Sequence, residues 1–212
     1  MLTETELTVV VMGLGYIGLP TAAVIARTGA RVLGVDVTAS VVETVNSGRV
    51  HIEEVDLDGL VSGVVARGTL RASMTIEPAD VFVIAVPTPF DDDHAPDIGY
   101  VLNAATTIAG VLKPGDTIIL ESTSPVGTTE QVRDLLATLR PDIRVPGRAG
   151  EQADIAIAYC PERVLPGTLR SGRNCASRSR TFSVVPTGEV DSRITASPAL
   201  STVAIVVAAR ST

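Results

Sequence analysis

The chain of 212 residues has room for one sizeable domain, and its 45% of hydrophobic residues can fill a core. Its net charge of −7 and its lack of a basic cluster argue against nucleic acid or a membrane as partner. Two cysteines cannot form a disulfide framework, the first residues lack a signal peptide's positive charge, and no apolar run reaches the roughly 20 residues of a bilayer span. We therefore expect a cytoplasmic protein.

The first apolar run, residues 9–12, ends in a turn with glycines at the spacing of a dinucleotide-binding fingerprint. We expect Gly13 to allow the tight turn, Gly15 to let backbone N–H groups approach a pyrophosphate, and Gly18 to let the next helix pack closely. The N-terminus of that helix, expected over residues 16–28, favours an anion.

A second apolar run, Arg31–Val35, follows a stop signal at Gly29 and ends at Asp36, about 20 residues after the glycines. A carboxylate at this place binds the hydroxyls of an adenine ribose and disfavours a 2′-phosphate, which predicts NAD rather than NADP. The alternative is a glycine-rich turn that binds nothing, with Asp36 only capping the next helix.

The next stretch is expected to form two helices and then two strands, at residues 39–47, 56–66, 70–73 and 81–86. Asp56 is a candidate cap for the second helix. His51 either contacts a ligand phosphate or is a loop histidine. Thr88, held between two prolines after the second strand, is a candidate cofactor contact, and the alternative is a rigid turn with an idle hydroxyl.

Three aspartates and a histidine at residues 91–94 offer metal-ligand side chains. Consecutive residues do not converge easily on one ion, so we predict a solvated loop and no metal. A helix over 97–112 and a strand over 117–120 then lead to a hydroxyl-rich segment, 121–129. Its hydroxyls either donate to a substrate or phosphate, or cap the helix that runs from about Thr128 to Leu139.

A last strand over 154–159 leads to Cys160, Glu162 and Arg163. The latter two lie either at the ligand side of the sheet or in a surface ion pair. Strands alternate with helices throughout, which predicts an α/β fold with a Rossmann-type, doubly wound parallel sheet.

Six segments together resemble the NAD-dependent nucleotide-sugar 6-dehydrogenases, and among them the UDP-N-acetylmannosamine branch. They are GLGYIGLPTAA at 13–23, GVD at 34–36, HIE at 51–53, AVPTPF at 85–90, ESTSPVGTTE at 121–130 and AYCPERVLPG at 158–167. The resemblance implies a homodimer that uses two NAD to oxidise a UDP-sugar C6 alcohol to a carboxylate, through an aldehyde and a cysteine adduct, for polysaccharide synthesis.

The resemblance also implies roles for individual residues. The family's NAD contacts correspond to Tyr16, Ile17, Asp36, Thr88 and Thr129. The start of its UDP-sugar site corresponds to Arg163 and Val164. Its catalytic pair, which orients water or stabilises the thioester-forming steps, corresponds to Thr123 and Glu162.

The pattern departs from the family after Gly167. The family's lysine–asparagine helix, dimerisation segment and glycine-rich cysteine motif are not matched, and no lysine follows Lys113. We expect Cys160 to be a packing residue and Cys175 to be incidental. The NAD-binding domain is thus expected over 1–167, with the rest of the chain forming an irregular, aberrant tail.

The tail, residues 168–212, contains six arginines and two acids, a local charge of +4, together with eight serines and six threonines. We expect it to result from a frameshift, and the alternative is a natural flexible tail. The expected function is oxidation of UDP-N-acetylmannosamine by family descent, in a chain that is inactive alone. The alternatives are another UDP-sugar (UDP-glucose or UDP-N-acetylglucosamine), a non-catalytic NAD-binding module, or a subunit completed by a separate chain.

Overall fold

The computed structural model describes residues 7–54, 56–89, 96–147 and 152–160, and the predicted tail and its boundary lie outside them. In chain order the elements are β1 (Thr8–Met12), α1 (Gly18–Arg27), β2 (Arg31–Val35), α2 (Ala39–Asn46), α3 (Leu57–Ala66), β3 (Leu70–Ser73), β4 (Val81–Ile84), α4 (Gly99–Ala109), β5 (Thr117–Glu121), α5 (Thr128–Leu139) and β6 (Ala156–Cys160). Within this described part, no helix has both the length and the apolar character needed to cross a bilayer.

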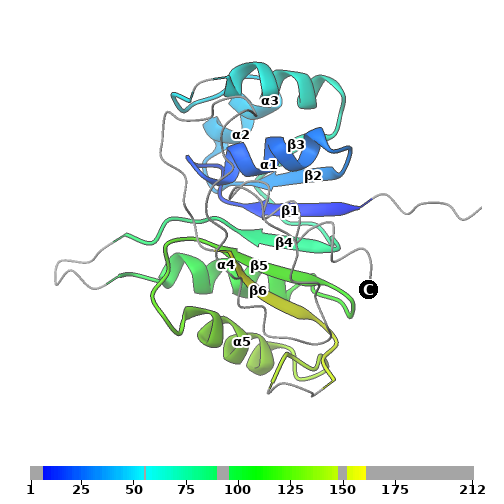
Figure 1. Ribbon diagram of the computed structural model, residues 1–212, viewed down its shortest axis with the longest axis vertical. Helices are drawn as coiled ribbons and strands as arrows, with labels where there is room; N and C mark the ends of the chain where they lie inside the picture. Colours follow the sequence, from blue (N-terminus) through cyan, green and yellow to red (C-terminus); the bar gives the residue numbers. More distant parts are fainter. Residues whose placement is uncertain (1–6, 55, 90–95, 148–151, 161–212) are drawn as a thin grey trace, which may run out of the picture.

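The six strands form one parallel sheet in the order β3-β2-β1-β4-β5-β6. The strand order steps outward from β1 in one direction and then, from β4 on, in the other, as in the predicted Rossmann-type fold. Figure 1 shows α1, α2 and α3 beside the β1–β3 half of the sheet, with α4 and α5 beside the β4–β6 half. The predicted doubly wound sheet is confirmed.

Successive residues of a strand pack on opposite faces of the sheet. In β1, Val9 and Val11 belong to the core that also contains side chains of α1, α2 and α3. Val10 and Met12 belong to the core with α4 and α5. A parallel strand covered on both faces has no solvent-facing positions, and this explains why β1 and β4 are continuous apolar runs in the sequence.

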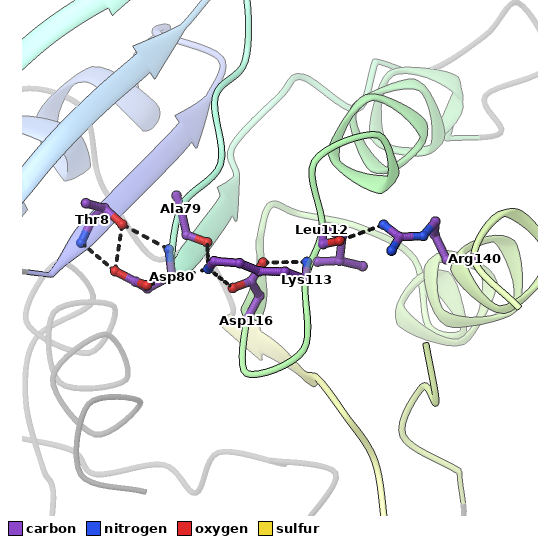
Figure 2. A network of polar contacts seen from close by, with 7 residues as sticks. All are labelled: Thr8, Ala79, Asp80, Leu112, Lys113, Asp116 and Arg140. Carbon is purple, nitrogen blue, oxygen red and sulfur yellow. Dashed lines mark hydrogen bonds and ion pairs between the residues drawn. The ribbon is translucent and has the colours of Figure 1, made fainter. Parts of the chain in front are cut away.

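A polar network joins the amino ends of β1, β4 and β5 (Figure 2). Asp80 Oδ2 accepts hydrogen bonds from the Thr8 N–H at 2.9 Å and the Thr8 hydroxyl at 2.6 Å. Lys113, the only lysine of the chain, donates from Nζ to the Ala79 carbonyl at 2.9 Å and to the Asp116 carboxylate. Asp116 is 1% exposed, and its Oδ2 also accepts from the Lys113 backbone N–H at 2.9 Å.

The pKa values of the two carboxylates in this network, Asp80 and Asp116, are shifted in opposite directions. Burial raises the pKa of Asp116 above its ordinary value of 3.8, against the effect of the bonds from Lys113. Burial also acts to raise the pKa of Asp80, but the bonds from Thr8 and the charge of Lys113 outweigh it and lower that pKa. Asp80 therefore contributes stability that is present above pH 3.8 and is lost as the pH falls through its folded pKa.

The C-terminal end of α4 is capped from another element. Arg140, which follows α5, donates from Nη1 to the carbonyls of Ala109 and Leu112 at 2.9 and 2.6 Å. Figure 2 shows the second of these bonds. Asp142 holds the guanidinium in place by accepting from its Nε and Nη2 at 2.9 and 2.7 Å. A cation at the last carbonyls of a helix satisfies acceptors that have no partner within it.

The edge strand β3 is covered by the side chain of Asn46, the last residue of α2. Asn46 Nδ2 donates to the Ala72 carbonyl at 2.9 Å, and its Oδ1 accepts from the Ala72 N–H at 2.7 Å. The side-chain amide thus bonds to both the backbone N–H and the backbone carbonyl of Ala72. Among the described strands, β3 pairs with β2 alone, so these groups face away from the sheet. Backbone groups at a sheet edge need such a cover, because they otherwise pair with another chain.

Two local predictions are wrong. Asp56 precedes α3 but makes no side-chain capping bond among the described residues, because its backbone is left-handed (φ 63°) instead of extended as at most N-caps. The helix expected over 97–112 is shorter, Gly99–Ala109, although its predicted apolar face is buried, Leu112 included. The predicted stop at Gly29 is confirmed by a φ of 101° there.

We expect Asn46→Asp to lower the free energy of unfolding by about 1–3 kcal/mol, since a carboxylate keeps the bond to the Ala72 N–H but leaves the Ala72 carbonyl facing an acceptor. Urea unfolding followed by circular dichroism measures the change. The matched control is Asn103→Asp, at an exposed position of α4. Equal unfolding midpoints for the two variants would contradict the proposed cover.

We expect Asp80→Asn to destabilise the chain at neutral pH, because the bonds from Thr8 and the charge of Lys113 then act on a neutral amide. The difference from the unmodified chain should shrink as the pH falls below 3.8 and Asp80 itself becomes protonated. Urea unfolding at a series of pH values measures both quantities. Asp134→Asn, at an exposed position of α5, is the control. If Asp80→Asn lowers the free energy of unfolding by the same amount at every pH, the Asp80 carboxylate is not the source of the pH-dependent stability.

Candidate functional site

The candidate site lies where the strands end. Gly13 follows β1, Asp36 follows β2, Thr88 follows β4 and Thr123 follows β5. Because all strands are parallel, these residues lie at one edge of the sheet. β1 lies between β2 and β4, so the glycine loop (residues 13–18) is at the point where the strand order changes direction, where open α/β sheets bind ligands.

Gly13 and Gly18 bring backbone segments into direct contact. Gly13 has a φ of 90°, and its N–H donates to the Val35 carbonyl at 2.8 Å. A Cβ on Gly13 would lie 2.8 Å from the Ala85 carbonyl oxygen, and a Cβ on Gly18 would lie 1.8 Å from the Gly13 carbonyl oxygen. No side chain fits at either place, so the turn and the close packing expected of these glycines are confirmed.

Gly15 is different, since a Cβ there would have no described atom within 4 Å. The open space lies in front of α1, whose N-cap, Ile17, is half-buried and whose first turn has no side-chain cap among the described residues. Tyr16 is 54% exposed beside it. The N–H groups at the start of α1 have no side-chain cap among the described residues, and the space beside Gly15 is open. This arrangement suits a pyrophosphate, which the glycine spacing predicts.

Asp36 is half-buried and faces the glycine loop. Its Oδ2 accepts from the Leu14 N–H at 2.9 Å, and its Oδ1 accepts from the Thr38 N–H, just before α2, at 2.9 Å. It therefore bonds both to the loop and to the residue that precedes the next helix. Each carboxylate oxygen has further acceptor capacity, so these bonds leave room for the hydroxyls of a ribose.

The hydroxyl-rich segment after β5 does not cap α5. The N-cap is Gly127 in a left-handed conformation, with no side-chain capping bond among the described residues. Thr128 instead donates to the Pro125 carbonyl at 2.8 Å, and the Ser122 and Ser124 hydroxyls bond to each other. The capping alternative is thus wrong for this segment, and the Ser122, Ser124 and Thr128 hydroxyls bond within the loop instead.

The predicted threonines are spread along the strand ends. Thr88 is half-buried in the loop after β4, and Thr123 is exposed after β5. Thr129, in the first turn of α5, lines a pocket of about 330 Å³ between α5, Pro146 and Tyr159 of β6. None of the residues that line this pocket comes from the glycine loop. The structure thus brings the glycines and Asp36 together and leaves Thr129 at the β6 side.

Several predicted residues lie outside the described residues, namely Glu162, Arg163, Val164, Cys175 and the cluster at 91–94. Cys160 is 1% exposed and belongs to the core on the α1 face, as predicted for a packing residue. His51 is exposed after α2. Among the described residues, no three histidine, cysteine or acidic side chains lie close enough to hold a metal ion.

Sequence reasoning missed the contact between Leu14 and Gly34. Leu14 is fully buried, and a Cβ on Gly34 would lie 2.6 Å from Leu14 Cδ2. A lone glycine inside an apolar strand is the signal that could have revealed it, because such a glycine often marks the close approach of another group.

Comparisons with known proteins agree with this geometry. The sequence model described as "UDP-glucose/GDP-mannose dehydrogenase family, NAD binding domain" matches residues 7–177. A UDP-N-acetyl-D-mannosamine dehydrogenase of Yersinia pestis is 59% identical over 162 residues, 76% of this chain and 39% of the relative. An NDP-N-acetyl-D-galactosaminuronic acid dehydrogenase of Ralstonia nicotianae is 57% identical over 160 residues, 76% of this chain and 38% of the relative.

A solved structure of a UDP-N-acetyl-mannosamine dehydrogenase from Staphylococcus aureus superposes with a TM-score of 0.68 at 40% identity. The superposition covers 76% of this chain and 38% of the Staphylococcus aureus protein. The chain thus spans about two fifths of the length of the relatives it matches. With the glycine loop, Asp36 and the parallel sheet in place, the chain belongs to the UDP-glucose/GDP-mannose dehydrogenase family and contains its NAD-binding domain.

Proposed function

We propose that the chain binds NAD across the glycine loop, with the diphosphate at Gly15 and the adenine ribose at Asp36. The observation that supports this proposal is the open space next to the backbone of Gly15. On either side of Gly15 the chain is tightly packed, because Gly13 lies against the Ala85 carbonyl and Gly18 lies against the Gly13 carbonyl. The bond from Leu14 N–H to Asp36 Oδ2 holds the carboxylate beside that surface. A negative charge there disfavours a 2′-phosphate and so favours NAD over NADP.

The remaining cofactor contacts that we propose follow the same edge of the sheet. Tyr16 and Ile17 begin the helix next to the open surface, and Thr88 follows the neighbouring strand β4. Thr129 lies further along, in the first turn of α5. A dinucleotide that extends from Asp36 toward β5 would pass these residues in this order.

We further propose that the chain is the cofactor-binding part of a UDP-sugar 6-dehydrogenase, with UDP-N-acetylmannosamine as the sugar. In this proposal Thr123 and Glu162 assist catalysis, and Arg163 and Val164 begin the sugar-nucleotide site. NAD would accept hydride from the sugar C6. Support comes from the names of the relatives at 57–59% identity, which all concern N-acetylated sugars, and from the exposure of Thr123 at the ligand edge.

The chain as it stands is proposed to bind the cofactor without turnover. Its only lysine, Lys113, is held at the amino edge of the sheet by Asp116 and Ala79, away from the site. Of the two cysteines, Cys160 lies within the described residues, where it is buried in the core. Neither the proton-transfer lysine nor the nucleophilic cysteine expected from the resemblance is therefore available at the described edge.

We expect Gly15→Val to weaken NADH binding by at least about tenfold, because the valine side chain fills the surface that the diphosphate approaches. Folding should be unaffected, since a Cβ at this position meets no described atom within 4 Å and the backbone needs no positive φ. Calorimetric titration with NADH and a thermal melt measure the two effects. Gly59→Val on α3, where a Cβ also meets nothing, is the matched control. Unchanged affinity in Gly15→Val would exclude the glycine loop as the site.

We expect no reduced nicotinamide to form when the 212-residue chain is mixed with NAD and UDP-N-acetylmannosamine, although NADH still binds. Absorbance spectroscopy measures turnover, and the same assay is repeated with UDP-glucose and UDP-N-acetylglucosamine. Turnover with either of the latter would show that another UDP-sugar is the substrate. Turnover with any of the three UDP-sugars would overturn the proposed inactivity.

A further inference from the structure

The side chain of Leu14 fills a notch that exists because residue 34 has no side chain. Leu14 lies between Gly13 and Gly15 and is fully buried. A Cβ on Gly34 would lie 2.6 Å from Leu14 Cδ2 and 3.0 Å from its Cδ1, so even one methyl group would displace the leucine. Gly34 belongs to β2 and lies two residues before Asp36. The notch and the proposed ribose-binding carboxylate are thus on the same strand end.

Three consecutive contacts join the glycine loop to this strand end. The Gly13 N–H donates to the Val35 carbonyl at 2.8 Å. The Leu14 N–H donates to Asp36 Oδ2 at 2.9 Å, and the Leu14 side chain rests on Gly34. The backbone of Leu14 is thus bonded to Asp36, while the side chain of the same residue lies against Gly34.

We infer that Leu14 and Gly34 form a size-matched pair that positions the glycine loop against Asp36, and that this pair thereby controls the affinity for dinucleotides with an unmodified adenine ribose. The inference rests on the proposed function. Both are positioning residues, because the buried Leu14 side chain and the side-chain-free Gly34 act through the loop backbone and Asp36. A methyl group at residue 34 pushes Leu14 outward and lengthens the bond between Leu14 N–H and Asp36.

The test uses the 212-residue chain with Gly34→Ala, the double variant Leu14→Val/Gly34→Ala, and Gly59→Ala as the matched control. Valine lacks the δ carbons, which would lie 2.6 and 3.0 Å from a Cβ on residue 34, so the double variant removes the two shortest contacts and leaves the one at 3.2 Å to the γ position. Three quantities are measured: the NADH dissociation constant, the melting temperature, and the hydrogen-exchange rate of the Leu14 amide without cofactor. The last reports the bond to Asp36 directly.

We expect Gly34→Ala to weaken NADH binding by about tenfold or more and to speed exchange of the Leu14 amide. The double variant should regain most of both losses, and Gly59→Ala should change neither. The inference fails if Gly34→Ala leaves the Leu14 amide protected, or if the double variant regains melting temperature but not affinity. If the unmodified chain does not bind NADH, the proposed function fails, and the exchange rates still decide whether the pair positions the loop.

Discussion

The close contact between the end of β1 and the start of α1 is the constraint on which the rest of this structure depends. A Cβ on Gly18 would lie 1.8 Å from the Gly13 carbonyl oxygen, and one on Gly13 would lie 2.8 Å from that of Ala85. Three backbone segments, from β1, α1 and the end of β4, therefore meet with no side chain between them. This contact places an uncapped helix N-terminus directly above the point where the strand order reverses, which is why an anion site can form there.

Polar side chains have different partners at the amino ends and at the carboxyl ends of the parallel strands. At the amino edge, Thr8, Asp80, Lys113 and Asp116 bond to one another and to backbone, so the charges there stabilise the strand ends. At the carboxyl edge, Asp36 is held by two backbone N–H groups and retains acceptor capacity. The charged groups at the amino edge are thus bonded to one another, whereas the proposed ligand contact lies at the opposite edge.

Membership of the dehydrogenase family is established by the match over residues 7–177, and it establishes the NAD-binding domain. The relatives are about two and a half times as long as the part they share with this chain. The described residues therefore contain the proposed NAD contacts, whereas the proposed sugar contacts begin at Arg163. Cys160 is buried in the core, and Lys113 is bonded at the amino edge of the sheet, opposite the proposed NAD contacts.

The order and type of the elements, the positions of Gly13, Gly15 and Gly18, and the acid at Asp36 could be read from the sequence, because apolar periodicity and glycine spacing are local properties of a chain. The failed cap at Asp56 shows the limit, since the backbone conformation at a helix start is not a property of residue type. Only the tertiary structure decided that Asn46 covers β3 and that Leu14 rests on Gly34. These contacts join residues about 20 or more positions apart, and their existence depends on strand register and helix placement, which no local pattern encodes.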